Sequence, residues 1–195
     1  MSVAWGFDGG IATLEGLSLA IGLSVVRCLR QFGVANVNLK WPNDILYNNK
    51  KLGGILIEVS GDPAGYCLAV VGIGLNVSMD QKQADSIDQP WINLRDILKE
   101  QSLPAITRNQ LAASLIDELG VILSDYHKRG FAAYKDEWLA AAAYLNKVVS
   151  IHAGNSIQEG VFCGLDQTGA LLLEIDGKEV LYHGGEVSLR GAYVS

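Results

Sequence analysis

Residues 40–59 read KWPNDILYNNKKLGGILIEV and combine a proline-containing turn, a polar turn and short apolar runs. The runs have the length of strands and are rich in isoleucine, leucine and tyrosine, and the segments between them contain proline, asparagine and aspartate, which favour turns. The pattern therefore predicts consecutive strands joined by tight connections. We expect strands at 37–41, 45–47 and 54–59, with turns at 42–44 and 48–51.

The chain on either side of this stretch extends the same unit. Residues 66–77 predict another strand after a Gly-Asp-Pro-Ala-Gly turn at 61–65. Upstream, residues 13–32 carry apolar side chains at helical spacing, and Gly33 supplies a stop. A helix over that range would cover one face of a mixed or mostly antiparallel sheet, which is an α+β arrangement.

The spacing of apolar residues changes twice in the middle and at the end of the chain, first to a helical pattern and then to a strand pattern. Residues 81–145 are helical in pattern, with a capping box at Thr107 to Gln110 and a second helix at about 131–145. The last fifty residues predict five short strands, which suit a small barrel or sandwich. We therefore expect two domains, at 1–146 and 147–195, with the boundary near Asn146. The buried stripe expected for the capped helix is Leu111, Leu115, Leu119, Ile122 and Tyr126.

Composition limits the class of protein. The 195 residues carry a formal net charge of -6 and contain no basic run, which argues against a nucleic-acid-binding surface. The most apolar stretch, 16–26, is too short to cross a bilayer, which needs about 20 residues. Three widely spaced cysteines favour buried thiols in a reducing compartment. We expect a cytoplasmic protein with no membrane and no nucleic-acid partner.

Two short segments carry the candidate chemistry. At Lys51-Leu52-Gly53-Gly54 a cation enters a strand whose glycines leave the backbone open, which suits an anionic ligand. At 72–76, GIGLN, alternate glycines clear one face of a strand and asparagine stands at its end. Each segment alone has an ordinary structural interpretation, namely a solvated hairpin lysine and a bulge or tight helix contact. Both interpretations stay open on the local pattern.

Taken together, the three elements KWPND at 40–44, KLGGILIE at 51–58 and GIGLN at 72–76 resemble the biotin-protein ligase family. The segments 169–174 and 184–190 are similar to the small C-terminal domain of that family. The resemblance implies a catalytic domain like that of class II synthetases and biotin ligases, followed by an SH3-like β-barrel.

The resemblance also implies an activity. Biotin and MgATP would give biotinyl-5'-AMP, and a lysine of a biotin carboxyl carrier protein would then attack it. Lys51 and Asp44 would be catalytic, with Asp44 either holding Mg2+ or activating the incoming amine. The implied binding residues are Lys51, Gly54, Gly72 and Gly74 for biotin, and Asn43, Asn76, Arg190 and Glu186 for ATP.

The sequence departs from the family pattern before the first helix. A Ser/Thr-Asn segment and a Gly-Arg-rich loop that wraps the adenylate in family members are not present. We therefore expect an N-terminally truncated, incomplete catalytic domain whose activity alone is weak or lost. A non-catalytic remnant acting in dimerisation or carrier docking, and a lipoate-type ligase, stay open as alternatives. An unpaired sheet edge would favour a homodimer.

Overall fold

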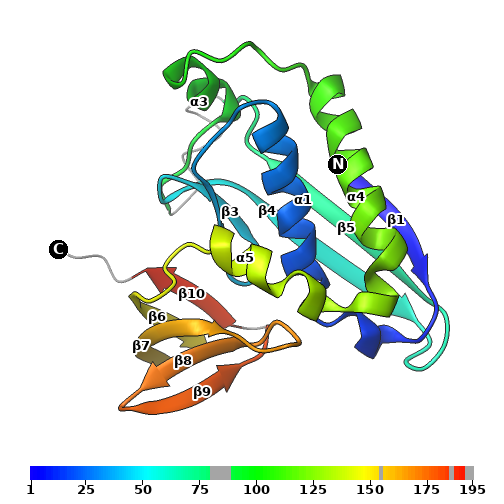
Figure 1. Ribbon diagram of the computed structural model, residues 1–195, viewed down its shortest axis with the longest axis vertical. Coiled ribbons are helices and arrows are strands. Elements are labelled where there is room, and N and C mark those ends of the chain that lie inside the picture. The colour runs from blue at the N-terminus through cyan, green and yellow to red at the C-terminus, as the bar shows by residue number, and fades with distance from the viewer. Residues whose placement is uncertain (80–88, 154–155, 185–186, 192–195) are drawn as a thin grey trace.

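The computed structural model describes residues 1–79, 89–153, 156–184 and 187–191. Two five-stranded sheets form the framework, and helices pack on the first of them (Figure 1). The larger sheet has the order β1-β5-β4-β3-β2, and neighbouring strands in it pair antiparallel. Its strands are β1 (Ser2–Phe7), β2 (Val37–Lys40), β3 (Asp44–Tyr47), β4 (Lys50–Gly61) and β5 (Cys67–Leu75).

The predicted strands and turns of residues 37–77 are confirmed, with two shifts. The first turn lies at 41–43 instead of 42–44, so Asp44 begins β3. Lys50 and Lys51 belong to β4 rather than to the turn before it. The turn itself is Asn48-Asn49, and both residues have positive φ, at 47° and 62°. Asparagine tolerates this left-handed conformation, so two residues suffice to reverse the chain. Lys51 is therefore placed by sheet pairing, not by a flexible loop.

Helix α1 (Leu17–Gln31) lies across one face of the sheet, beside α4 (Arg108–Arg129) (Figure 1). It begins later than the predicted 13–32 because Gly16 has φ of 73°, and a short 3-10 turn, η1 (Ile11–Leu14), precedes it. The stretch Ile11–Gln31 is apolar and long enough to suit a membrane span by length and composition. Most of α1 is buried in the core, however, which is how an internal helix of a folded domain behaves.

The helical middle region is confirmed in outline. Thr107 and Gln110 form the predicted capping box at the start of α4, and the predicted stripe along that helix is buried. The second predicted helix, 131–145, is shorter: η2 (Phe131–Ala133) leads into α5 (Lys135–Ala141). The reason is a competing contact, because Ala143 N–H donates to the carbonyl of Leu39 on the edge of the sheet. Helix α3 (Leu94–Glu100) precedes this region.

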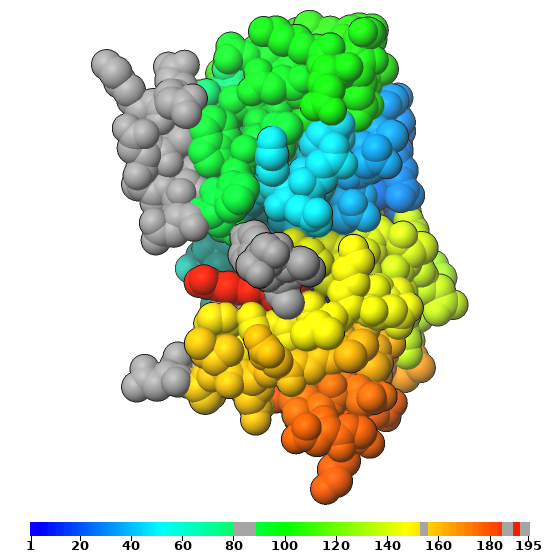
Figure 2. Space-filling model, turned by 90° about the vertical axis from the view of Figure 1, so that its left-hand side faces the viewer, coloured from blue at the N-terminus to red at the C-terminus, as the bar shows by residue number. Residues whose placement is uncertain are grey.

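The C-terminal sheet has the order β10-β6-β7-β8-β9, also antiparallel, and contains the five predicted short strands. It forms a separate lobe, and β10 lies where that lobe meets the rest of the molecule, in red in Figure 2. Trp138 of α5 packs edge-on against Phe162 of β7. Its strands are β6 (Val148–Ala153), β7 (Ser156–Leu165), β8 (Leu171–Ile175), β9 (Lys178–Tyr182) and β10 (Val187–Gly191).

The expectation of buried cysteines is right for two of the three. Cys28 and Cys67 are buried, and burial raises the pKa of the Cys28 thiol. Cys163 is exposed, which contradicts the expectation. The register of β7 shifts between Phe162 and Gly164, so Cys163 sits in the irregular part of the strand and is turned outward.

Candidate functional site

The larger sheet has a core face, covered by helices, and an open face. The side chains of β4 point alternately to the two faces. Ile55 is 4% exposed and belongs to the core that includes α1, whereas the neighbouring Leu56 is 64% exposed. Successive side chains point to opposite faces, so the open face carries Gly54 and Leu56. A shallow hollow of about 570 Å3 lies there. It is lined by Met1, Ser2, Asn43, Asp44, Lys51, Gly54, Ile55, Leu56, Gly72, Ile73 and Gly74.

The floor of this hollow is bare backbone. Gly54 pairs with Gly74 across the two strands, and Leu56 pairs with Gly72. A methyl group added at Gly74 would lie 3.9 Å from its nearest neighbour, and one at Gly54 would lie 3.6 Å away. Folding therefore does not require glycine at these two positions on steric grounds. The missing side chains leave room for a ligand to lie against the sheet.

A carboxylate held between two lysines stands at one end of the hollow. Asp44 Oδ1 lies 2.6 Å from Lys51 Nζ, and Asp44 Oδ2 lies 2.6 Å from Lys40 Nζ. The side chain of Asp44 is only 11% exposed, so both pairs are partly shielded from water. The cluster carries a net charge of +1. A second negative group entering the hollow, such as a carboxylate or phosphate, would be attracted to it.

Lys40 is the member of this cluster to which the sequence interpretation gave no role. It lies opposite Asp44 in the pairing of β2 with β3, across the Trp41-Pro42-Asn43 turn. Residues that flank a tight antiparallel turn face each other, so the pairing was readable from the predicted hairpin. What the pattern did not reveal is that Asp44 also reaches Lys51 on the next strand.

Lys51 is fixed through its backbone. Its N–H donates to Pro90 O at 2.8 Å, and its carbonyl accepts from Ile92 N–H at 3.0 Å and from Asn76 Nδ2 at 3.1 Å. Asn76 was predicted to bind ATP phosphates. The structure instead uses its side-chain amide to hold the carbonyl of Lys51, and Asn76 does not line the hollow. The geometry makes it a positioning residue.

Asn43 has a comparable double role. Its side chain donates to the carbonyl of Ile55 at 3.0 Å, and its own carbonyl accepts from Ile55 N–H at 2.9 Å. These two bonds fasten the turn to β4. Asn43 thus lines the hollow, and its side-chain amide is already engaged with β4. Its predicted contact with ATP stays a prediction.

A second hollow adjoins the first and shares Asp44. Its walls include Lys40, Tyr144 and Arg190, so it lies between the first sheet and the end of β10. Arg190 therefore lines the same hollow as Asp44 and Lys40, and its predicted role at the ATP end of the site stays a prediction. Glu186, the other residue predicted there, lies outside the described residues.

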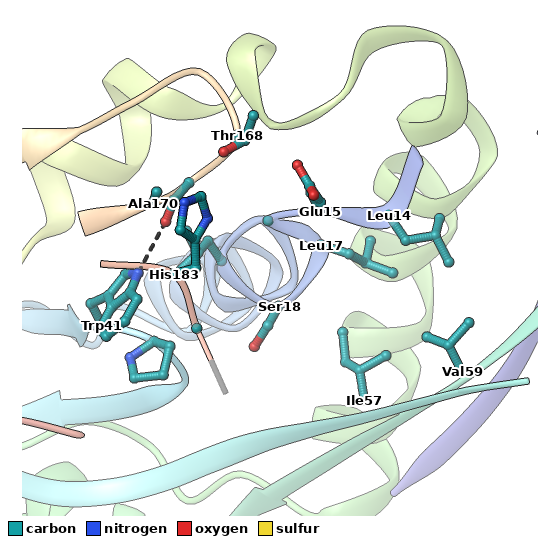
Figure 3. A pocket seen from close by; sticks show the side chains of 15 residues that line it. Leu14, Glu15, Leu17, Ser18, Trp41, Ile57, Val59, Thr168, Ala170 and His183 are labelled. Atoms are coloured by element: carbon teal, nitrogen blue, oxygen red, sulfur yellow. Dashed lines mark hydrogen bonds between the residues drawn. The ribbon is translucent and has the colours of Figure 1, made fainter. Parts of the chain in front are cut away.

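The turn that carries Asp44 is buttressed from the C-terminal lobe. The indole Nε1 of Trp41 donates to Gly169 O at 3.0 Å, shown as the dashed line in Figure 3, and Trp41 is 2% exposed. Gly169 lies in a turn organised by Asp166. Burial acts to raise the pKa of Asp166, but hydrogen bonds from Ala170 N–H and from Thr168 outweigh it, and the pKa is lowered. The C-terminal turn is thus a rigid support for the site.

The predicted magnesium role of Asp44 does not fit this arrangement. Both of its carboxylate oxygens are within 2.6 Å of an ammonium group, and a divalent cation there would meet two positive charges. Among the residues that the structure describes, no cluster of three or more possible metal ligands occurs. Asp44 therefore meets an approaching divalent cation with both carboxylate oxygens already paired.

Comparisons with known proteins match both parts of the chain. Residues 1–76 match the model of the Biotin/lipoate A/B protein ligase family, and residues 144–190 match the Biotin protein ligase C terminal domain. The bifunctional ligase/repressor BirA of Escherichia coli (strain K12) is 36% identical over 192 residues, which are 98% of this chain. This chain belongs to the biotin-protein ligase family.

Other members of the family extend the match. The biotin-[acetyl-CoA-carboxylase] ligase of Mycobacterium tuberculosis is 30% identical over 190 residues, 94% of this chain and 62% of that protein. A solved structure of biotin protein ligase from Aquifex aeolicus in complex with biotin and ATP has a TM-score of 0.76 at 23% identity. It covers 98% of this chain and 79% of that one. The chain spans 58% of the length of the Escherichia coli relative.

Proposed function

We propose that the protein acts in the ATP-dependent ligation of biotin to a lysine of a biotin carboxyl carrier protein, through biotinyl-5'-AMP. One observation carries the proposal. The Lys51 ammonium stands beside a side-chain-free bed of Gly54 and Gly74, in a hollow open to solvent. A compact bicyclic ring with an aliphatic chain that ends in a carboxylate fits a bare floor that has a cation at its end.

In the first step, a carboxylate oxygen of biotin attacks the α-phosphorus of MgATP, the bond from that phosphorus to the bridging oxygen breaks, and pyrophosphate leaves. Negative charge concentrates on the phosphoryl oxygens as the new bond forms. Lys51 is placed to stabilise that charge, and Asp44 and the bonds to its backbone hold it in position. Lys40 and Arg190 line the adjoining hollow and are proposed to face the nucleotide.

In the second step, the carrier lysine attacks the carbonyl carbon of the mixed anhydride, an amide forms, and AMP leaves. The attacking amine has to lose a proton before or during this step. Asp44 is the carboxylate among the described residues that line the hollow, and we assign it that role together with the orientation of Lys51. Its Oδ1 holds Lys51, and the incoming amine would reach Oδ2 by taking the place of Lys40 there.

On this proposal the two domains contribute different parts of the site. Residues 1–146 would supply the biotin bed and the lysines, and residues 147–195 the Arg190 side of the nucleotide pocket. The relatives that match are biotin ligases, and the C-terminal match is to a biotin ligase domain, which favours biotin over lipoate. We place the reaction in the cytoplasm, where the carrier and MgATP occur together.

Titration calorimetry of the 195-residue chain with biotin, in the presence and absence of MgATP, tests the proposal. Lys51→Ala should weaken the response, and in an active preparation it should slow adenylate formation by about 10²- to 10³-fold, the cost of removing one charge-stabilising donor. Lys50→Ala is the matched control, since Lys50 is an exposed neighbour in the same strand. Failure of biotin to bind with MgATP present would refute the proposal for this chain.

The melting temperature separates chemistry from folding in this test. Without Lys51, Asp44 keeps its pair with Lys40, so no buried charge is left alone. The loss of one partly exposed ion pair should cost about 1 kcal/mol or less. A large drop in melting temperature for Lys51→Ala would show that the lysine acts through stability instead.

A further inference from the structure

A further hollow, of about 530 Å3, lies away from the proposed site, and its lining residues come from α3, the connection from α3 to α4, the first residue of α4 and the segment after β5. It shares no described lining residue with the hollow at Lys51. Its lining is Val77, Ser78, Leu94, Arg95, Leu98, Lys99, Leu103, Ala105, Ile106 and Arg108. We call it the α3 pocket.

The interior of the α3 pocket is aliphatic. Leu94 and Leu98 are 2% and 6% exposed, and they form its α3 side. Leu103 and Ile106 pack from the connection, and Val77 packs from the end of β5. These last three are only partly buried, which leaves apolar surface uncovered at a concave site. None of the described lining residues is aromatic, so the walls favour a flexible hydrocarbon chain over a base that would stack on a ring.

The rim of the α3 pocket is cationic in an acidic protein. Three of its ten described lining residues are Arg95, Lys99 and Arg108, and none of the ten is acidic, although the whole chain has only 15 lysines and arginines in 195 residues. Asp96 lies 3.9 Å from Arg95, and half of its side chain is exposed. The rim therefore attracts an anion on a molecule whose overall charge is -6.

Arg108 is the least expected of the three cations. It occupies the first turn of the 22-residue helix α4, and no acidic residue lies in that turn. A cation there opposes the helix dipole, which is positive at the N-terminus, whereas Lys99 in the last turn of α3 follows the usual preference. Exceptions to local rules of this kind are expected at functional or strained sites.

We propose that the α3 pocket binds an aliphatic monocarboxylate, that is, a molecule with the chemistry of a free fatty acid. The hydrocarbon chain lies on Leu98, Leu103 and Ile106, and the carboxylate meets Lys99 and Arg108. A single anionic head satisfies the rim, and Ser78 is the one uncharged hydroxyl among the described lining residues, so the pocket lacks the polar groups that a sugar or base would need. The inference concerns a site separate from that of the proposed ligase function, and it stands without it.

The test is titration of the full chain with decanoate below its micelle concentration, followed by calorimetry and by methyl NMR shifts. We expect one site per chain and shifts at Leu98, Leu103 and Ile106. Affinity should rise through hexanoate, octanoate and decanoate by up to about fourfold per methylene, because each buried methylene contributes about 0.8 kcal/mol. Decyltrimethylammonium, with the opposite charge, should not bind.

Charge variants test the rim. Lys99→Gln and Arg108→Gln should each weaken decanoate binding about two- to fivefold, as expected for exposed charge pairs. Lys128→Gln is the matched control, because it removes an exposed lysine at the other end of α4. All three substitutions are at exposed positions, and unchanged melting temperatures would verify that they fold.

Four outcomes would overturn the inference. Decanol binding as tightly as decanoate would exclude a role for the cations. Decyl phosphate binding more than tenfold tighter would assign the pocket to a different head group. Unchanged affinity in the Lys99→Gln, Arg108→Gln double variant would move the carboxylate elsewhere. Concentration-dependent shifts of the same methyls without added ligand would identify a second copy of the chain as the occupant.

Discussion

The substitution Gly74→Ala is expected to raise stability and lower biotin affinity at the same time. Gly74 lies in the strand β5 without positive φ, and the new methyl would have no atom closer than 3.9 Å. Alanine restricts the unfolded chain more than glycine does, which favours the folded state by about 0.5–1 kcal/mol. For a chain of this length that gain corresponds to a rise in melting temperature of about 1–4 °C.

The same methyl would stand on the floor where biotin is proposed to lie. Forcing an extra methyl into a close-packed contact costs about 1–3 kcal/mol, which corresponds to a dissociation constant about 5- to 140-fold larger. Calorimetry with biotin measures the affinity, and differential scanning calorimetry measures the melting temperature. The reasoning would be refuted if biotin bound the variant as tightly as the unaltered chain.

Two other glycines provide controls for Gly74→Ala. A methyl at Gly53 would lie 2.3 Å from the carbonyl oxygen of Gly74, so Gly53→Ala should destabilise the fold. A methyl at Gly120 in α4 would meet nothing within 4 Å, so Gly120→Ala should stabilise the helix by about 1 kcal/mol and leave biotin affinity unchanged. Of the three variants, Gly74→Ala is the one expected to raise the melting temperature and weaken biotin binding together.

Two further predictions concern the supports of the site and the fold. Trp41→Phe removes the donor to Gly169 O and part of a buried ring, and should cost about 2 kcal/mol in urea unfolding; a cost below about 0.5 kcal/mol would count against the buttress. Glu137→Gln tests pH dependence: the hydrogen bond from Arg27 lowers the pKa of Glu137, so its contribution is present above the ordinary carboxyl pKa and is lost as pH falls through the lowered value. Because the Glu137 side chain is 38% exposed, the effect is limited to about 1 kcal/mol. The difference in unfolding free energy between the unaltered chain and the variant should shrink to zero as the pH is lowered from 7 to 3. A difference that does not change with pH would contradict this prediction.

Local pattern was sufficient for most of the larger sheet. The turn chemistry of 40–51 and the alternation in β4 located these strands and Gly54, because pairing of consecutive strands follows directly from the chain order. Asp44 and Lys51 were predicted in turns, but they belong to β3 and β4. The glycine floor was also predictable, since alternate residues of a strand share a face. These features depend on contacts between neighbours in sequence.

Features that depend on distant contacts were harder to predict. The predicted helix at 131–145 ends early because Leu39, about a hundred residues away, offers a carbonyl to Ala143. Asn76 was assigned to phosphate, but a side-chain amide can serve a ligand or the backbone, and the sequence does not distinguish the two. The approach of Arg190 to Asp44 requires the C-terminal lobe to dock, which no local pattern encodes.

Core packing constrains the residues on one face of β4, and the open hollow constrains those on the other. Ile55 and Ile57 are held by the packing beneath α1, whereas positions 54 and 56 face the open hollow. A side chain at 54 would also contact Asn43, Asp44 and Lys51. Mutations on the outward side can therefore accumulate without disturbing the interior, so ligand preference is free to drift or to be redesigned while the scaffold stays the same. A small combinatorial library confined to 54, 56, 72 and 74 would be the natural place to seek altered vitamin selectivity.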